Sequence, residues 1–176
     1  MISSTPFDQH FRHCSWLVLI TLCWCNITLA LPEDANQQIE VQASSSELYL
    51  DIGLVIYRGT STNPARITQG SLQIYGTEIR IERNEGALKK ITATGTPARF
   101  QQQLEVDQDI IKASGLTLDF DNSAGILNID VEAEFIQAGN TLSGHHIDYD
   151  MRAQRANATS RSDVEPVTMT ILPQQP

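Results

Sequence analysis

Beyond residue 30 this 176-residue sequence contains no cysteine. Its three cysteines, Cys14, Cys23 and Cys25, all lie near the start of the chain. A domain formed by the remaining residues therefore cannot be stabilised by disulfides, and it cannot hold zinc through thiolates. Apolar packing and backbone hydrogen bonds must hold it together.

Residues that could carry catalysis are also scarce. After residue 30 the only histidines are His145 and His146, and neighbours on a strand point to opposite faces, so these two cannot share a metal. A calcium loop needs Gly at its sixth and Glu at its twelfth position, where this sequence has Ala124 and Asp130. Turn chemistry explains Asp121 to Gly125 without a metal. No serine-hydrolase, phosphate-loop or zinc-protease motif occurs, which predicts a protein that is not an enzyme and needs no cofactor. A carbohydrate-active enzyme using paired carboxylates remains an alternative.

Basic residues are too few for nucleic-acid binding. The chain has 12 Lys and Arg against 21 Asp and Glu, a net charge of −9, and its largest basic cluster beyond residue 30 is Lys89-Lys90. Binding to a phosphate backbone needs a positive stripe, which is missing here.

One long apolar run stands at the start of the chain. Trp16 to Ile27 follows Arg12 and is followed by a small-x-small ending at Ala30. The run is shorter than the roughly 20 residues that a membrane-spanning helix needs. Residues 1–30 are therefore predicted to be a secretory signal peptide cleaved after Ala30, with an uncleaved membrane anchor as the alternative.

The stretch LQIYGTEIRIER, Leu72 to Arg83, alternates apolar and polar residues on either side of a glycine, which predicts a strand bent in its middle. The pattern is an apolar residue, a small residue two positions later, and apolar residues three and five positions after that. Four copies are found, starting 33, 37 and 31 residues apart: Val41-Ala43-Ser46-Leu48, Ile74-Gly76-Ile79-Ile81, Ile111-Ala113-Leu116-Leu118 and Leu142-Gly144-Ile147-Tyr149. Such a repeat predicts a solenoid-like stack of units that bury their apolar faces together.

No segment after residue 30 has a helical period, so each unit is interpreted as a bent strand, a turn and two further strands. The small residues let the chain turn a corner, so that two sheets meet at an angle and their apolar face lines a trough. An ordinary filled core is the alternative interpretation of that face. The outward side is expected to carry charged residues: Arg80, Glu82, Asp119, Asp121, Glu132, Glu134, Asp148 and Asp150.

Four segments, Leu31 to Gly53, Ile67 to Arg83, Gly95 to Phe100 and Gln137 to Asp150, resemble the OstA-like family of periplasmic lipopolysaccharide transport proteins in their order and spacing. The resemblance implies an all-β, twisted open jelly roll of about 16 antiparallel strands over residues 31–171, with an apolar groove. Residues 172–176 are then a flexible tail.

The resemblance further implies a bridge protein that binds lipopolysaccharide acyl chains (lipid A) in its groove. It would pass them across the periplasm from LptC at the inner membrane to LptD for outer-membrane assembly. By residue, Ile39 and Val41 match a lipid-facing pair in the first strand, Phe100 an inward aromatic, and Arg83 a basic residue at the groove rim. The apolar face adds the remaining candidate lipid-binding residues: Leu48, Ile74, Ile79, Ile81, Leu116, Leu118, Phe135 and Leu142.

An open roll leaves edge strands that can accept partner strands. The resemblance implies LptC at the N-terminal edge, the N-terminal domain of LptD at the C-terminal edge, and head-to-tail self-association, which is a contact that does not close. The predicted edge residues are Ile39, Glu40, Val41, Val167, Met169 and Ile171. A structural β-solenoid adaptor of the same machinery, without its own groove, is the alternative.

Overall fold

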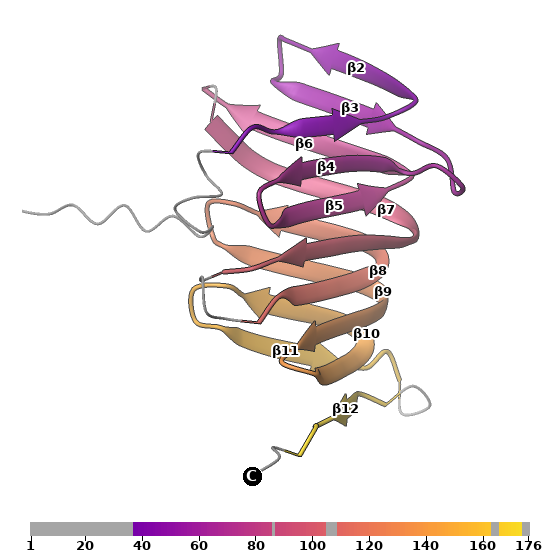
Figure 1. The fold of residues 1–176 in the computed structure, drawn as a ribbon, viewed down its shortest axis with the longest axis vertical. Coiled ribbons are helices and arrows are strands. Elements are labelled where there is room, and N and C mark those ends of the chain that lie inside the picture. The colour runs from indigo at the N-terminus through magenta and orange to yellow at the C-terminus, as the bar shows by residue number, and fades with distance from the viewer. Residues whose placement is uncertain (1–36, 86, 105–108, 163–165, 174–176) are drawn as a thin grey trace, which may run out of the picture.

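The computed structural model describes residues 37–85, 87–104, 109–162 and 166–173, and the predicted signal peptide lies outside them. All regular secondary structure among these residues is β-strand (Figure 1). The strands are β1 (Glu40–Gln42), β2 (Ser45–Tyr49), β3 (Leu54–Arg58), β4 (Ala65–Gln69), β5 (Leu72–Gly76), β6 (Glu78–Asn84), β7 (Ala87–Gln102), β8 (Ile111–Asp121), β9 (Ile126–Gln137), β10 (Asn140–Asp150), β11 (Arg155–Thr159) and β12 (Thr168–Thr170). Within the described ranges, no helix is long and apolar enough to cross a membrane.

All twelve strands belong to one antiparallel sheet that folds into two walls. β7, β8, β9 and β10 run around the corner and contribute a segment to each wall. The first wall contains β2, β3, β6, β11 and one half of each bent strand, and the second wall contains β1, β4, β5, β12 and the other halves. Each wall thus has eight segments, but the described residues form twelve strands and not about sixteen as expected, because four strands serve both walls.

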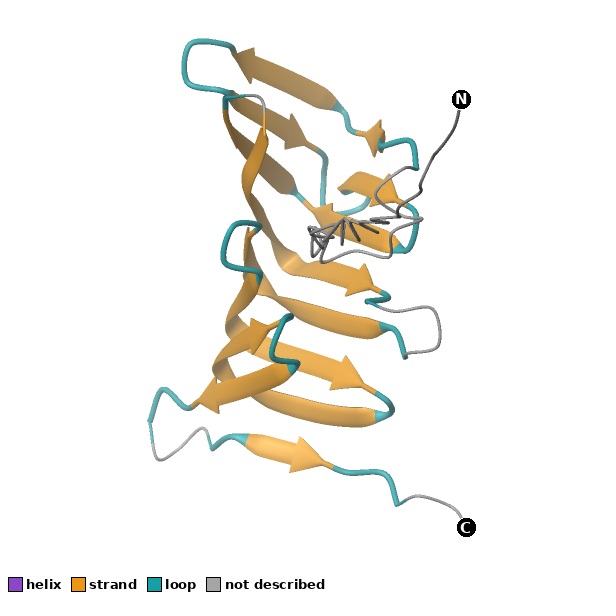
Figure 2. Cartoon of the chain, turned by 90° about the vertical axis from the view of Figure 1, so that its left-hand side faces the viewer, coloured by secondary structure: helices purple, strands orange, loops and turns teal. Residues whose placement is uncertain are grey.

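The walls join along one side and are separate along the other, which we call the mouth. Figure 2 looks onto the mouth, where turns end the segments of both walls. At the corner, the pairing of neighbouring strands shifts between Thr94 and Ala98, between Ser114 and Thr117, and between Gly144 and His146.

Small residues at these corners allow the backbone to approach closely, as the sequence predicted. A Cβ at Gly76 would stand 2.8 Å from the carbonyl oxygen of Thr94, and one at Gly115 would stand 2.9 Å from a methyl of Ile129. The corner of β9 has no glycine. There, Val131 and Glu132 adopt positive φ angles of 60° and 56°.

Two details of the sequence interpretation are wrong. Two separate strands were expected after each bent strand. In the structure they form one continuous strand, which is β7 in the second unit and β9 in the third, and both β7 and β9 bend at a corner. The third repeat is also misaligned by two residues, because Ala113, and not Ile111, shares its row with Phe100 and Phe135. The correct unit is Ala113-x-Gly115-x-x-Leu118-x-Phe120.

Strand alternation places the core between the walls. Three of the rows of side chains that face inward form the centre of this core, and each follows one register from strand to strand. The corner row of the first wall is Ser46, Tyr57, Ile79, Ala93, Leu118, Ile129, Ile147 and Ala158. The mouth row of the first wall is Leu48, Val55, Ile81, Ile91, Phe120, Leu127, Tyr149 and Ala156. The central row of the second wall is Val41, Ile67, Ile74, Phe100, Ala113, Phe135, Leu142 and Met169.

Candidate functional site

Nine of the twelve side chains predicted to bind lipid lie in these three rows. They are Val41, Leu48, Ile74, Ile79, Ile81, Phe100, Leu118, Phe135 and Leu142. Because the members of each row lie side by side on neighbouring strands, the three rows form one continuous apolar lining that passes through all twelve strands. This lining is the candidate functional site.

Three predicted residues lie elsewhere. Leu116 is half-buried at the corner of β8, where the register shifts, and it does not join the core cluster. Arg83 is exposed at the end of β6, just after a bulge, and its backbone N–H donates to the carbonyl of Gly53 at 2.8 Å. Ile39 precedes β1 and is 53 % exposed.

The lining is exposed at its two ends and buried between them. At the N-terminal end Leu48 is 61 % exposed, and at the C-terminal end Met169 is 60 % exposed, whereas Ile79, Leu127 and Ile147 have no exposed surface. A hollow of about 450 Å³ opens beside Leu48 and is lined also by Leu50, Asp51, Ile52, Gly53, Val55, Arg83, Asn84 and Glu85. The N-terminal end therefore presents exposed apolar side chains next to polar and charged ones.

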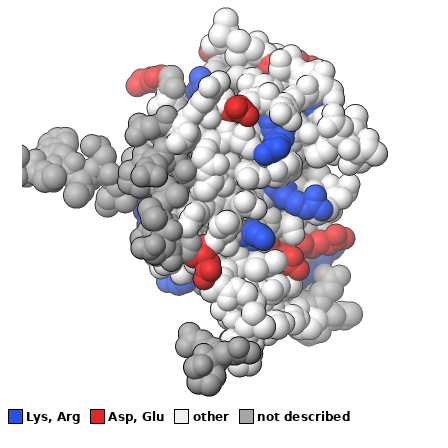
Figure 3. Space-filling model, in the orientation of Figure 1, with Lys and Arg blue, Asp and Glu red and all other residues white. Residues whose placement is uncertain are grey.

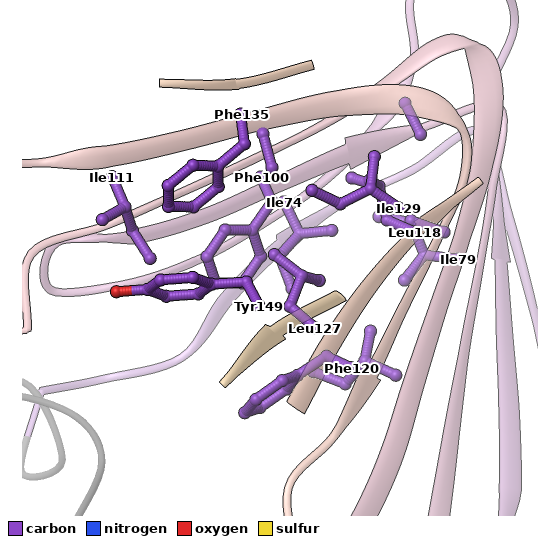
Figure 4. Packing of buried hydrophobic residues seen from close by; sticks show 14 of the residues in the cluster. Ile74, Ile79, Phe100, Ile111, Leu118, Phe120, Leu127, Ile129, Phe135 and Tyr149 are labelled. Atoms are coloured by element: carbon purple, nitrogen blue, oxygen red, sulfur yellow. The ribbon is translucent and has the colours of Figure 1, made fainter. Parts of the chain in front are cut away.

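In the middle of the molecule, the walls meet through aromatic rings. Phe135 of the second wall and Tyr149 of the first wall have ring centroids 4.4 Å apart at an interplanar angle of 33°, and Phe100 lies 6.2 Å from Phe120 (Figure 4). A chain lying between the walls must separate these rings or take their place.

The sequence-based list missed much of the buried lining. Ile91, Phe120, Leu127, Ile129, Ile147 and Tyr149 are all buried in the two rows of the first wall. The signal for most of them was present, because the segment from Ile126 to Phe135 alternates, and Ile147 and Tyr149 belong to the fourth repeat. Only the register between strands shows that they face the predicted residues.

The outer faces carry the charged side chains. On the first wall, ion pairs join Arg58 to Glu78 at 2.9 Å and Lys90 to Asp119 at 2.7 Å. Figure 3 shows basic side chains on the outer face of the second wall. The strand register places Arg66, Arg99 and Lys112 on this face, and none of them has an ion pair within the described ranges. No charged residue belongs to the three inward rows, so the site offers no acid–base pair.

His146 is held on the outer face between two carboxylates. Its Nδ1 lies 2.6 Å from Asp130 and its Nε2 lies 2.9 Å from Asp148. Partial burial alone would lower the pKa of His146, but the two hydrogen bonds outweigh it and raise that pKa above the ordinary value. Within the described ranges, no group of three or more His, Cys, Asp or Glu side chains could hold a metal ion.

Both ends of the stack present edge strands. Among the described residues, β1 pairs only with β4 and β12 only with β10. β2 and β11 are further edges, because each pairs with a single neighbour in the first wall. In the part of the chain that the structure describes, each end therefore has one free edge per wall.

Comparisons with known proteins agree with this geometry. The family model described as LptA/(LptD N-terminal domain) LPS transport protein matches residues 40–155. The lipopolysaccharide export system protein LptH of Pseudomonas aeruginosa is 36 % identical over 134 residues, covering 76 % of this chain and 74 % of that protein. The lipopolysaccharide export system protein LptA of Haemophilus influenzae is 31 % identical over 152 residues, covering 83 % of each chain.

A solved structure shows the same fold. The crystal structure of LptH, described as the LptA-homologous periplasmic component of the lipopolysaccharide transport device of Pseudomonas aeruginosa, superposes with a TM-score of 0.70 and 32 % identity. The match covers 81 % of this chain and all of that one. The open two-walled sheet, its apolar lining and these relatives together establish that the chain belongs to the LptA/LptD N-terminal-domain family of lipopolysaccharide transport proteins, which are not enzymes.

Proposed function

We propose that this protein carries the acyl chains of lipopolysaccharide between its two walls while the lipid crosses the periplasm. The observation that carries the proposal is the uninterrupted apolar lining, in which every strand contributes an inward side chain. Each methylene moved out of water is worth about 0.8 kcal/mol, so a lipid with several acyl chains needs such a lining over its whole path.

Aliphatic and aromatic side chains of similar character repeat along each row. A lipid shifted by one strand then meets nearly the same surroundings, so the free energy changes little as it moves. No covalent step is required. The aromatic contacts between the walls close the middle in the free protein, so loading must separate Phe135 from Tyr149.

We also propose a direction of transfer. The N-terminal end, where Val41 and Leu48 are exposed, would be the receiving side, and LptC would pair there with β1 or β2. The C-terminal edges β11 and β12 would pair with the N-terminal domain of LptD or with another copy of this chain. Edge pairing of this kind uses main-chain hydrogen bonds and has no intrinsic end point.

Photocrosslinking tests the proposal. A photoreactive residue is placed at Val41 or Phe100, and at the outward Glu132 as the control, in the presence of purified lipopolysaccharide. Adducts at both inward positions and none at Glu132 are expected. Absence of adducts at Val41 and Phe100 in a folded protein would leave a filled core, and the structural adaptor would then be the better explanation.

A further inference from the structure

One buried polar atom in the lining has no partner. Tyr149 lies in the mouth row of the first wall with no exposed surface, and its hydroxyl oxygen has no hydrogen bond to any described residue. Figure 4 shows that oxygen at the outer end of the ring, on the side away from Leu127 and Ile129. The amide of Gln137 lies nearby but does not reach hydrogen-bonding geometry with the hydroxyl.

Packing does not explain the hydroxyl. The ring contact with Phe135 would be the same for a phenylalanine, whereas an unsatisfied buried hydroxyl costs stability. Burial raises the pKa of Tyr149 above its ordinary value, so the group stays protonated and can donate. A buried donor kept without a partner in the free protein calls for a partner that arrives later.

The surroundings indicate where along a ligand this donor would act. A further inward row of the second wall lies two residues along each strand from the central row, on the side of the mouth. In this row, amide side chains stand next to apolar ones. The register pairs are Gln69 with Leu72, Gln102 with Ile111, and Gln137 with Asn140. Gln102 is the one buried polar residue of the described chain, at 4 % exposure. The lining is thus apolar near the corner and contains both apolar and amide side chains near the mouth. This arrangement matches an acyl chain whose hydrocarbon end lies near the corner and whose polar linkage lies near the mouth.

We infer that the Tyr149 hydroxyl donates a hydrogen bond to the ester or amide carbonyl that attaches an acyl chain to its headgroup. This inference rests on the proposed function, since it requires an acyl chain between the walls. Tyr149 then fixes the depth at which the chain lies: the carbonyl stays at the mouth row and the methylenes fill the space towards Ile129 and Ile147. The carbonyl would also satisfy the hydroxyl that the free protein leaves unpaired.

The test compares two lipids and three proteins by isothermal titration calorimetry. The lipids are a lysophosphatidylglycerol and its ether-linked counterpart of equal chain length, which lacks the carbonyl, both used below micelle-forming concentrations. The proteins are the wild type, Tyr149→Phe and Tyr75→Phe. Tyr75 is the matched control because its hydroxyl lies on the outer face of the second wall and donates to Gln73 at 2.7 Å.

The wild type should bind the ester lipid more tightly than the ether lipid. Tyr149→Phe should lose about three- to tenfold in affinity for the ester lipid and nothing for the ether lipid, as expected for one hydrogen bond. Tyr75→Phe should match the wild type with both. Without lipid, Tyr149→Phe should unfold at the same temperature as the wild type or a higher one, because it removes only an unsatisfied group.

Three results would overturn the inference. Equal losses for both lipids would mean that the hydroxyl acts on the fold and not on the carbonyl. If the wild type and Tyr149→Phe bind both lipids equally well, the apolar groove remains and only the carbonyl contact is excluded. A folded wild type that binds neither lipid would instead refute the proposed function, and the inference with it.

Discussion

Gly76 lies directly against the carbonyl oxygen of Thr94, at the corner between β5 and β6. A Cβ at this position would stand 2.8 Å from that oxygen and 2.9 Å from the carbonyl oxygen of Glu78, and both are backbone atoms that cannot move aside. The same Thr94 carbonyl accepts the backbone N–H of Thr77 at 2.7 Å. The corner therefore depends on the missing side chain.

Gly76→Ala should lower the free energy of unfolding by about 1–3 kcal/mol, because the added methyl overpacks the corner. Chemical denaturation followed by circular dichroism measures this. Gly70→Ala is the comparison, since Gly70 has a φ of 57° in the turn between β4 and β5, and it should lose about 1 kcal/mol for the left-handed backbone. Equal losses in the two variants would show that the close contact with Thr94 does not matter.

His146 should make stability depend on pH. Its pKa is raised in the folded protein, so its contribution is fully present below the unfolded pKa of about 6.5 and is lost as pH rises through the folded value. The loss should be at most about 1 kcal/mol, because Asp130 and Asp148 are partly exposed and water screens the pairs.

Denaturation curves between pH 5 and pH 9 check the His146 prediction. His146→Gln should remove this part of the pH dependence, whereas His145→Gln should keep it. If His146→Gln and the wild type lose stability in parallel over that range, the two carboxylates do not hold a charged imidazole.

Val131 has a φ of 60° at the corner of β9, a conformation that branched side chains adopt only under strain. Val131→Asn should raise the unfolding free energy by about 0.5–1 kcal/mol, because asparagine tolerates the left-handed region. Thermal unfolding gives the change. Val131→Thr retains the branched Cβ and should gain nothing, so a similar rise in both variants would point to the loss of an exposed apolar group as the cause.

The C-terminal edge should control association. Met169 and Ile171 are 60 % and 66 % exposed, so Met169→Lys with Ile171→Lys should leave the unfolding temperature unchanged. Lysines on an edge strand oppose further pairing, and sedimentation velocity should show fewer oligomers. Ile110→Lys adds one lysine away from the edge strands and is the control. Unchanged oligomers in the double variant would place the contact elsewhere.

The sequence predicted the all-β class, the repeat and the corner because each depends on local alternation and small residues. The two-residue error in the third repeat did no harm to the predicted faces, since a shift of two keeps every side chain on its side. It did assign Leu116 to the lining in place of Phe120. Only the pairing of β8 with its neighbours distinguishes the two alignments.

Other features of the site depend on contacts between strands that are distant in sequence. Asp130 lies opposite His146 on the neighbouring strand, which no motif around the adjacent histidines indicates. The continuity of β7 through Gly95 and Pro97 contradicts the usual expectation that these residues end a strand. The unpaired hydroxyl of Tyr149 depends on what the opposite wall fails to supply, and the repeat alone does not specify that.

The corners at which the chain passes from the second wall to the first, which we call the forward corners, all have the same spacing. Five residues separate Val41 from Ser46, Ile74 from Ile79, Ala113 from Leu118 and Leu142 from Ile147, although the units themselves differ in length. Variation in length is therefore carried by the turns at the mouth and by the return strands. For protein engineering, the mouth turns are the sites where a fluorophore or a peptide tag can be inserted. A single residue added at a forward corner would instead turn half of a unit inside out.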